Sequence, residues 1–186
     1  MFMETNKENF VQLVDENDQP VGIMEKYEAH KKAALHRAIS VFIVNSKGDW
    51  LIHRRALDKY HSNGLWTNAT CSHPYPDESY LEAAKRRLKY EMGINCELIP
   101  LFHFIYQEKV NDELTEHELD HVFFGVSDDV PIHNTGEVEE WKYIPYRQLL
   151  EDVENHPEKY TVWFKIILKK VKAYIDTENL TESSCR

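Results

Sequence analysis

The chain is poor in cysteine and contains no long apolar run. Its three cysteines among 186 residues, Cys71, Cys96 and Cys185, are too few and odd in number for a disulfide framework, so we expect a reducing compartment. No stretch approaches the length of a membrane span. The opening stretch "MFMETNKENF" carries acids and no apolar core, unlike a signal peptide. These absences predict a cytoplasmic protein without a membrane segment.

Basic side chains are scarce relative to acidic ones. The chain has 22 Lys and Arg against 32 Asp and Glu, a formal net charge of −10. This charge argues against a general binding surface for nucleic acid or anionic membranes. An anionic ligand would therefore need a local cluster of cations. Because 42% of the residues are hydrophobic, the chain suits one globular domain over residues 1–186.

Apolar periodicity predicts an α/β fold. Apolar runs bounded by turn residues predict strands at residues 9–14, 37–44, 50–56, 96–106, 118–126 and 137–146. Stripes of helical period predict helices at residues 78–92, near 147–153 and at 160–175. Asp77 or Ser79 would cap the first helix, Gly93 would end it, and Pro157 would open the last. We expect a mixed β-sheet sandwiched between helices, with a polar tail at about residues 176–186.

The predicted helix at residues 78–92 carries a charge pair, Arg87 and Glu91, four residues apart. This spacing alone also describes an ordinary helix ion pair. The segment resembles the Nudix box, G-x5-E-x7-R-E-U-x-E-E-x-G-U, where U is aliphatic. It matches the box at Glu78, Arg86, Leu88, Glu91, Gly93 and Ile94, and departs from it at Ser72, Arg87 and Tyr90. The carboxylates that gather water-activating cations in Nudix hydrolases are thus reduced to Glu91.

Further stretches narrow this resemblance. They are "EKYEAH", "LHRAISVFIV", "HRRALDK", "WTNATCSHP", "RRLKYEMGI", "TEHELDHVF" and "YTVWF". Together they resemble the type I isopentenyl-diphosphate isomerases over roughly residues 10–170. The resemblance implies a Nudix-like fold and a small isoprenoid diphosphate as substrate. Interconversion of isopentenyl and dimethylallyl diphosphates passes through a tertiary carbocation, so it needs an acid, an opposed base and a dry pocket.

The resemblance implies three residues for the proton transfers. Cys71 would handle the proton next to the diphosphate-bearing carbon, and we expect a nearby helix N-terminus and cations to favour its thiolate. Glu118 would face the reacting carbon from the other side, with Tyr106 helping to deliver the second proton. Without the resemblance, Cys71 also reads as a buried apolar cysteine. Cys96 and Cys185 match no motif of the family.

A metal site is implied by the same resemblance. Glu116 and Glu118 are two residues apart, so a strand would place both on one face. Buried together they would need a cation or a shared proton, whereas a solvated strand end would need neither. The implied partners are His30, His36 and His73, a set that suits zinc, manganese or magnesium. His30 and His36 cannot share a helix face, so the chain must bend between them. We assign no metal role to His53, His61, His103, His117, His121, His133 or His156.

The substrate's unreacting end needs an anchor. The implied cations are Lys26, Arg55, Lys59 and Arg87, each of which singly also reads as a surface charge. Magnesium held by Glu91 and the backbone carbonyl of Cys71 would complete the grip on the diphosphate. Trp163 would cover the isoprenoid tail with a π face that stabilises a cation, although its position also fits a core aromatic. Trp66 would line or support the same pocket.

Three other functions fit parts of the sequence. A Nudix hydrolase of a nucleoside diphosphate derivative is disfavoured by Arg87 and Tyr90, which replace two of its carboxylates. A cysteine hydrolase using Cys71 and His73, which would share a strand face, leaves the basic cluster unexplained. A non-enzymic metal-binding module would make the cysteine dispensable. We predict the isomerase.

Overall fold

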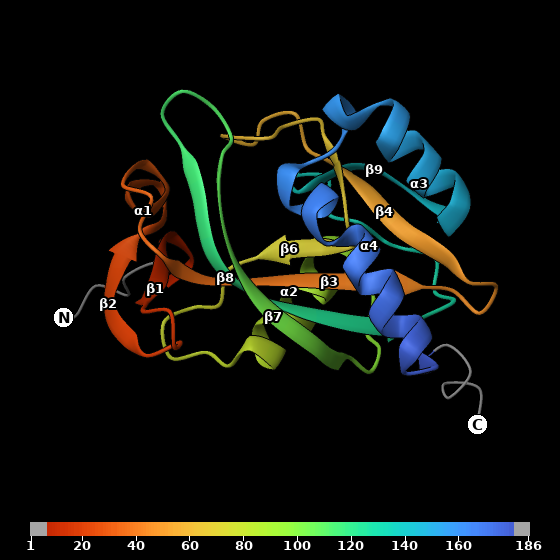
Figure 1. Ribbon diagram of the computed structural model, residues 1–186, viewed down its shortest axis with the longest axis horizontal. Helices are drawn as coiled ribbons and strands as arrows, with labels where there is room; N and C mark the ends of the chain where they lie inside the picture. Colours follow the sequence, from red (N-terminus) through yellow and green to blue (C-terminus); the bar gives the residue numbers. More distant parts are fainter. Residues whose placement is uncertain (1–6, 181–186) are drawn as a thin grey trace.

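A computed structural model describes residues 7–180, in which a mixed sheet is flanked by helices (Figure 1). The strands are β1 (Phe10–Val14), β2 (Pro20–Glu25), β3 (His36–Val44), β4 (Asp49–Arg55), β5 (Trp66–Thr67), β6 (Thr70–Ser72), β7 (Ile99–Lys109), β8 (Thr115–Val126) and β9 (Val138–Pro145). The helices are α1 (Lys26–Lys31), α2 (Tyr80–Met92), α3 (Tyr146–Asn155) and α4 (Val162–Thr177), with short 3-10 helices η1 (Lys7–Asn9) and η2 (Pro157–Lys159). Residues 1–6 and 181–186, including Cys185, lie outside the described part. No helix within residues 7–180 is both long and apolar enough to cross a membrane.

Strand β3 is the centre of the sheet. It pairs in parallel with β8 along its whole length and antiparallel with β1 and β6. It pairs with β4 only at Ile43↔Leu51 and Val44↔Trp50. Beyond those positions β6 lies next to β3, while β5 and β9 pair with β4. The pairing between the successive strands β3 and β4 is therefore short, and each strand acquires different neighbours.

The two faces of the sheet pack against different helices. On β3, Phe42 and Val44 belong to a core cluster that includes Phe164 and Ile167 of α4. The alternate residues Ile39, Val41 and Ile43 pack in a second cluster with Ala84, Leu88 and Met92 of α2. Figure 1 shows α4 in front of the sheet and α2 behind it. Because both faces are covered, β3 reads as a continuous apolar run, and the predicted sandwich is confirmed.

Helix α2 begins and ends through local chemistry. The Ser79 side chain accepts from the backbone N–H of Glu82, and the Glu82 carboxylate accepts from the N–H of Ser79, which completes a capping box. Gly93 ends the helix with φ of 71°. A Cβ at Gly93 would lie 2.7 Å from the carbonyl oxygen of Ile132, so both conformation and space require glycine there.

Several boundaries differ from the sequence prediction. Pro157 opens η2 rather than the last helix, because extended Tyr160 interrupts the chain and α4 begins only at Val162. Strand β2, which begins at Pro20 and forms a hairpin with β1, is not among the predicted strands. The last helix continues to Thr177, two residues into the predicted tail. Periodicity did not reveal α1, β5 and β6, each of which is six residues or shorter.

Candidate active site

A cavity of about 180 Å³ opens where β3 and β4 separate. Ten of the residues singled out in the sequence line it: Lys26, Arg55, Lys59, Cys71, His73, Arg87, Glu91, Glu116, Glu118 and Trp163. They come from α1, β4, β6, α2, β8, α4 and the connecting segments. Three others, His30, His36 and Tyr106, are buried directly against these side chains, as described below. The fold thus gathers residues more than 130 positions apart into one site.

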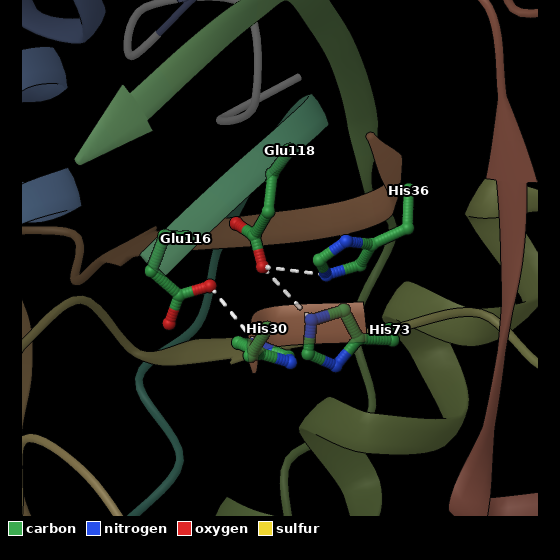
Figure 2. A group of neighbouring side chains, drawn as sticks. All are labelled: His30, His36, His73, Glu116 and Glu118. Carbon is green, nitrogen blue, oxygen red and sulfur yellow. Dashed lines mark hydrogen bonds and ion pairs between the residues drawn. The ribbon is translucent and has the colours of Figure 1, made fainter. Parts of the chain in front are cut away.

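One end of the cavity is a histidine–carboxylate cluster, His30, His36, His73, Glu116 and Glu118 (Figure 2). One nitrogen or oxygen atom from each residue lies within 4.8 Å of the corresponding atoms of the others. The chain bends between the first two histidines as predicted: α1 ends at Lys31, Ala33 has φ of 49°, and His36 begins β3. Glu116 and Glu118 share a face of β8, as predicted from their spacing.

Hydrogen bonds fix the histidine tautomers in this cluster. His30 Nδ1 lies 2.6 Å from the carbonyl oxygen of Lys26, and His36 Nδ1 lies 2.8 Å from that of Ala34. A carbonyl only accepts, so each Nδ1 carries the hydrogen and each Nε2 presents a lone pair. Among the described residues neither Nε2, nor Glu116 Oε2, makes a hydrogen bond. Orphaned acceptors in a dry site are costly, and converging N and O lone pairs fit a divalent cation.

The two carboxylates of the cluster repel each other in this low-dielectric setting. Glu116 and Glu118 are 2% and 8% exposed. Burial raises the pKa of Glu116, and the neighbouring Glu118 carboxylate raises it further. His73 Nε2 lies 2.8 Å from Glu118 Oε1 and His30 Nε2 lies 3.1 Å from Glu116 Oε2. A bound cation would relieve this repulsion, so the arrangement can hold a metal.

Tyr106 lies behind this cluster, opposite Glu118 in the β7–β8 pairing. Its hydroxyl donates to Glu118 Oε2 over 2.6 Å. Burial raises the pKa of Tyr106 well above its ordinary value, and the Glu118 carboxylate adds to the shift. Tyr106 therefore stays protonated, and its hydroxyl proton points at a carboxylate on the cavity wall.

Cys71 lies on β6 and faces the same cavity as Glu118. Strand β3 sets both positions, because Ser40 pairs with Cys71 and His36 pairs with Glu118. Burial raises the pKa of the Cys71 thiol to about 12, against a lowering effect of Arg55. The nearby cation acts in the expected direction, but the cost of burying the charge is the larger effect, so the pKa of the thiol stays above its ordinary value.

Arg55 and Trp163 close the wall beside Cys71. Arg55 Nη1 lies 3.8 Å from Cys71 Sγ, and the guanidinium carbon lies 5.4 Å from the centroid of the Trp163 ring. The Trp163 Nε1–H donates to Thr67 Oγ1 over 2.9 Å, which helps to fix the plane of the ring. Of the two alternatives predicted for Trp66, the structure favours support: Trp66 is not among the lining residues, and its carbonyl accepts from the N–H of Thr161 at the start of α4.

The other end of the cavity is a cation cluster, Lys26, Lys59 and Arg87 with Glu91 and Glu137. Arg87 donates from Nε and Nη2 to Glu91 Oε1 over 2.9 and 2.7 Å, and its Nη2 lies 3.2 Å from Glu137 Oε2. Lys59 pairs with the same Glu137 carboxylate. Burial lowers the pKa of Lys26, and the neighbouring cations lower it further. This end concentrates positive charge on a chain that is acidic overall.

Sequence reasoning missed Glu137 and His61. Glu137 is one of several acids in "GEVEE", and nothing in that run marks the one that faces Lys59 and Arg87. His61 was given no metal role, yet its Nε2 lies 3.4 Å from Glu116 Oε1. Its loop is too irregular for a periodicity argument, so no local signal predicts that contact. Of the other histidines assigned no role, His53 is turned toward the carbonyl of Ala69.

Comparison with known proteins agrees with this geometry. Residues 34–164 match the NUDIX domain family. An "Isopentenyl-diphosphate Delta-isomerase" of Pectobacterium atrosepticum is 49% identical over 164 residues, which cover 88% of this chain and 92% of the relative. A protein of the same name from Halorhodospira halophila is 38% identical and covers 86% and 93%.

Solved structures show the same fold at low sequence identity. A Deinococcus radiodurans protein superposes with a TM-score of 0.71 at 20% identity, covering 87% of this chain and 98% of that one. The MutT protein of Methanosarcina mazei has a TM-score of 0.63 at 20% identity, covering 78% and 95%. The chain therefore belongs to the Nudix superfamily and, within it, to the isopentenyl-diphosphate Delta-isomerase family.

Proposed function

We propose that this protein interconverts isopentenyl diphosphate and dimethylallyl diphosphate. The observation that carries the proposal is that Cys71 and Glu118 line one shielded cavity. They reach it from β6 and β8, on either side of β3. Membership of the isomerase family, with identity of 38% to 49% over most of the chain, supports the same reaction. The substrate is a small isoprenoid diphosphate. We propose that the protein acts in the cytoplasm and has no nucleic-acid partner.

The Tyr106–Glu118 pair acts on one side of the substrate. In the direction toward dimethylallyl diphosphate, a proton from this pair adds to the terminal CH₂ carbon of the alkene, whose π electrons form the new C–H bond. A tertiary carbocation remains on the neighbouring carbon. The 2.6 Å hydrogen bond between the two groups lets a proton lost by one be shared with the other.

Cys71 acts on the other side. Loss of a proton from the carbon next to the diphosphate-bearing carbon returns an electron pair to the cation and forms the new double bond; the Cys71 thiolate accepts that proton. With its pKa raised to about 12 by burial, the resting thiol is ready for the reverse reaction, in which it donates. The forward reaction requires that this thiol first lose its proton, and Arg55, 3.8 Å away, is the cation that favours the loss.

The remaining residues hold the substrate and shelter the cation. Lys26, Arg55, Lys59 and Arg87 bind the diphosphate, and Glu91 with the Cys71 carbonyl would hold magnesium on it. The π face of Trp163 stabilises the carbocation by about 2 kcal/mol when desolvated. Anchoring at the diphosphate places the alkene between the two proton-transferring groups. His30, His36, His73, Glu116 and Glu118 would hold a second divalent ion, Mn²⁺, Zn²⁺ or Mg²⁺, which supplies positive charge beside the Glu118 carboxylate.

The alternative functions fit the site less well. Hydrolysis of a nucleoside diphosphate derivative would use the carboxylate positions occupied by Arg87 and Tyr90, and Arg87 is ion-paired with the remaining Glu91. A cysteine hydrolase would need His73 as a base for Cys71, but His73 Nε2 is engaged by Glu118 Oε1 at 2.8 Å. A metal-binding module leaves unexplained the cation cluster at the opposite end of the cavity.

The test is to incubate the protein with isopentenyl diphosphate and magnesium in deuterated water and follow the products by NMR. We expect dimethylallyl diphosphate with deuterium in a methyl group. Release of phosphate would instead indicate a hydrolase, and unchanged substrate would refute both enzymes. A Cys71→Ala variant that yields the product at the wild-type rate would overturn the role of the thiol.

A further inference from the structure

His61 is a buried histidine that the proposed function does not use. It lies in the loop between β4 and β5, with its side chain 5% exposed. Its Nε2 is 3.4 Å from Glu116 Oε1. The ring centroid lies 5.5 Å from that of His30, and the ring stands edge-on to Trp163 at 6.2 Å. His61 thus lies on the wall of the cavity and contacts the histidine–carboxylate cluster there.

The contacts of His61 indicate a tautomer opposite to that of His30 and His36. His30 and His36 donate from Nδ1 to backbone carbonyls and present a bare Nε2. In His61, Nδ1 lies 3.3 Å from Ser62 Oγ, a hydroxyl that can donate to it. The N–H then belongs on Nε2, the nitrogen that lies 3.4 Å from Glu116 Oε1.

The backbone around His61 is held in place. Arg55 donates from Nη2 to the carbonyl of His61 over 3.3 Å and from Nε to the carbonyl of Ser62 over 3.1 Å. Ser62 has φ of 50°, a conformation that a non-glycine residue keeps only when its surroundings impose it. The orientation of the ring is therefore set by the same Arg55 that lies against Cys71.

We propose that His61 is a positioning residue for the metal site. Its Nε2–H holds Oε1 of Glu116, and this leaves Oε2, which has no hydrogen-bond partner among the described residues, facing His30 Nε2 as the metal-binding oxygen. The inference rests on the proposed function in that Glu116 binds a metal. Partners that orient a ligand from behind typically change metal affinity 10- to 100-fold when removed.

The test compares two substitutions at this position. His61→Phe keeps an aromatic ring against Tyr60 and Trp163 but has no N–H, whereas His61→Gln keeps an N–H donor near the position of Nε2. His103→Gln, at an exposed histidine on β7, is the matched control. Mn²⁺ affinity is measured by calorimetric titration of metal-free, full-length protein without substrate. We expect His61→Phe to weaken Mn²⁺ binding roughly 10- to 100-fold, and His61→Gln and His103→Gln to stay close to wild type.

Wild-type affinity in His61→Phe would overturn the inference. Equal losses in the Phe and Gln variants would also overturn it, since packing rather than the N–H would then be responsible. Excess Mn²⁺ should restore isomerase activity to His61→Phe, because the residue acts through Glu116; failure of that rescue would mean direct contact with substrate. If the Mn²⁺ affinities separate as expected but wild type does not isomerise, the proposed function fails while this inference stands.

Discussion

The two ends of the cavity satisfy their charged groups in different ways. At the histidine–carboxylate end, the side chains of His30 and His36 are fully buried, and three acceptor atoms have no hydrogen-bond partner within the described chain. At the cation end, the Lys59 and Arg87 side chains are 22% and 17% exposed and both pair with Glu137. At the first end the converging groups are mainly acceptors, while at the second Glu91 and Glu137 offset only part of the charge of three cations.

This difference suggests that the two ends of the cavity have different roles, one in turnover and one in substrate binding. Buried acceptors without a partner are costly, so the first end favours binding of a cation. The ion pairs of the second end can exchange partners when a diphosphate arrives, because phosphate oxygens can replace the carboxylate oxygens as charged acceptors for Lys59 and Arg87. Substitutions at the first end should therefore abolish turnover, and substitutions at the second should mainly weaken binding.

The largest effect is expected for Glu118→Gln. Loss of a positioned acid–base group lowers kcat by about 10²- to 10⁴-fold, and the same change removes a metal ligand. The measurement is the rate of dimethylallyl diphosphate formation, with the melting temperature as a check on folding. Glu108→Gln, at an exposed glutamate on β7, is the matched control. Near-wild-type kcat in Glu118→Gln would contradict the role of this end.

Metal binding should stabilise the protein through the buried end. An ion that binds only the folded state adds about 2.7 kcal/mol at a concentration 100 times its Kd. For a chain of this size that raises Tm by roughly 5–10 °C. Thermal unfolding of chelator-treated protein across a Mn²⁺ series measures the shift. The shift should shrink in Glu118→Gln and persist in Arg87→Gln; a Tm that does not respond to any divalent ion would rule out the cluster as a metal site.

Arg87→Gln should separate binding from turnover. A hydrogen bond to a charged group is worth about 1.5–3 kcal/mol, so we expect KM for isopentenyl diphosphate to rise roughly 10- to 100-fold with little change in kcat. Steady-state kinetics give both constants. Arg147→Gln, whose wild-type side chain is 91% exposed, serves as the control. An unchanged KM would remove Arg87 from the diphosphate anchor.

The smallest effect is expected for Trp163→Phe, which keeps an aromatic face but loses the N–H that donates to Thr67. Loss of one buried hydrogen bond costs about 1 kcal/mol, a fall in Tm of about 2–4 °C. The value of kcat should change far less than in Trp163→Leu, which removes the π face. Equal kcat losses in the two variants would show that the hydrogen bond, and not the ring, is what matters.

Much of the fold and most of the site could be predicted from the sequence, for identifiable reasons. The long strands and α2 carry strong periodicities, and α2 has a capping box and a terminal glycine. Short elements such as β6, three residues long, have no period to detect. The resemblance of whole motifs, rather than spacing, brought His30, His36 and Glu116 into one predicted site.

What the sequence could not show depends on contacts between distant segments. Glu137 meets Lys59 across 78 positions and His61 meets Glu116 across 55, and neither pair has a local pattern. The ionisation of Cys71 was also out of reach, because it depends on how deeply the thiol is buried against how close Arg55 lies. The relative size of these two effects on the pKa depends on how the side chains pack in the folded protein.

Strand β3 positions the residues that act in the two proton transfers. Its alternate residues His36 and Ser40 stand beside Glu118 on one flank and Cys71 on the other. Side chains along a strand point to alternate faces of the sheet. Inserting or deleting one residue within β3 would therefore put Cys71 and Glu118 on opposite faces, with one of them toward α2. Insertions and deletions should therefore be tolerated in the β3–β4 turn. Within β3, substitutions should be tolerated, but a change in the number of residues should not.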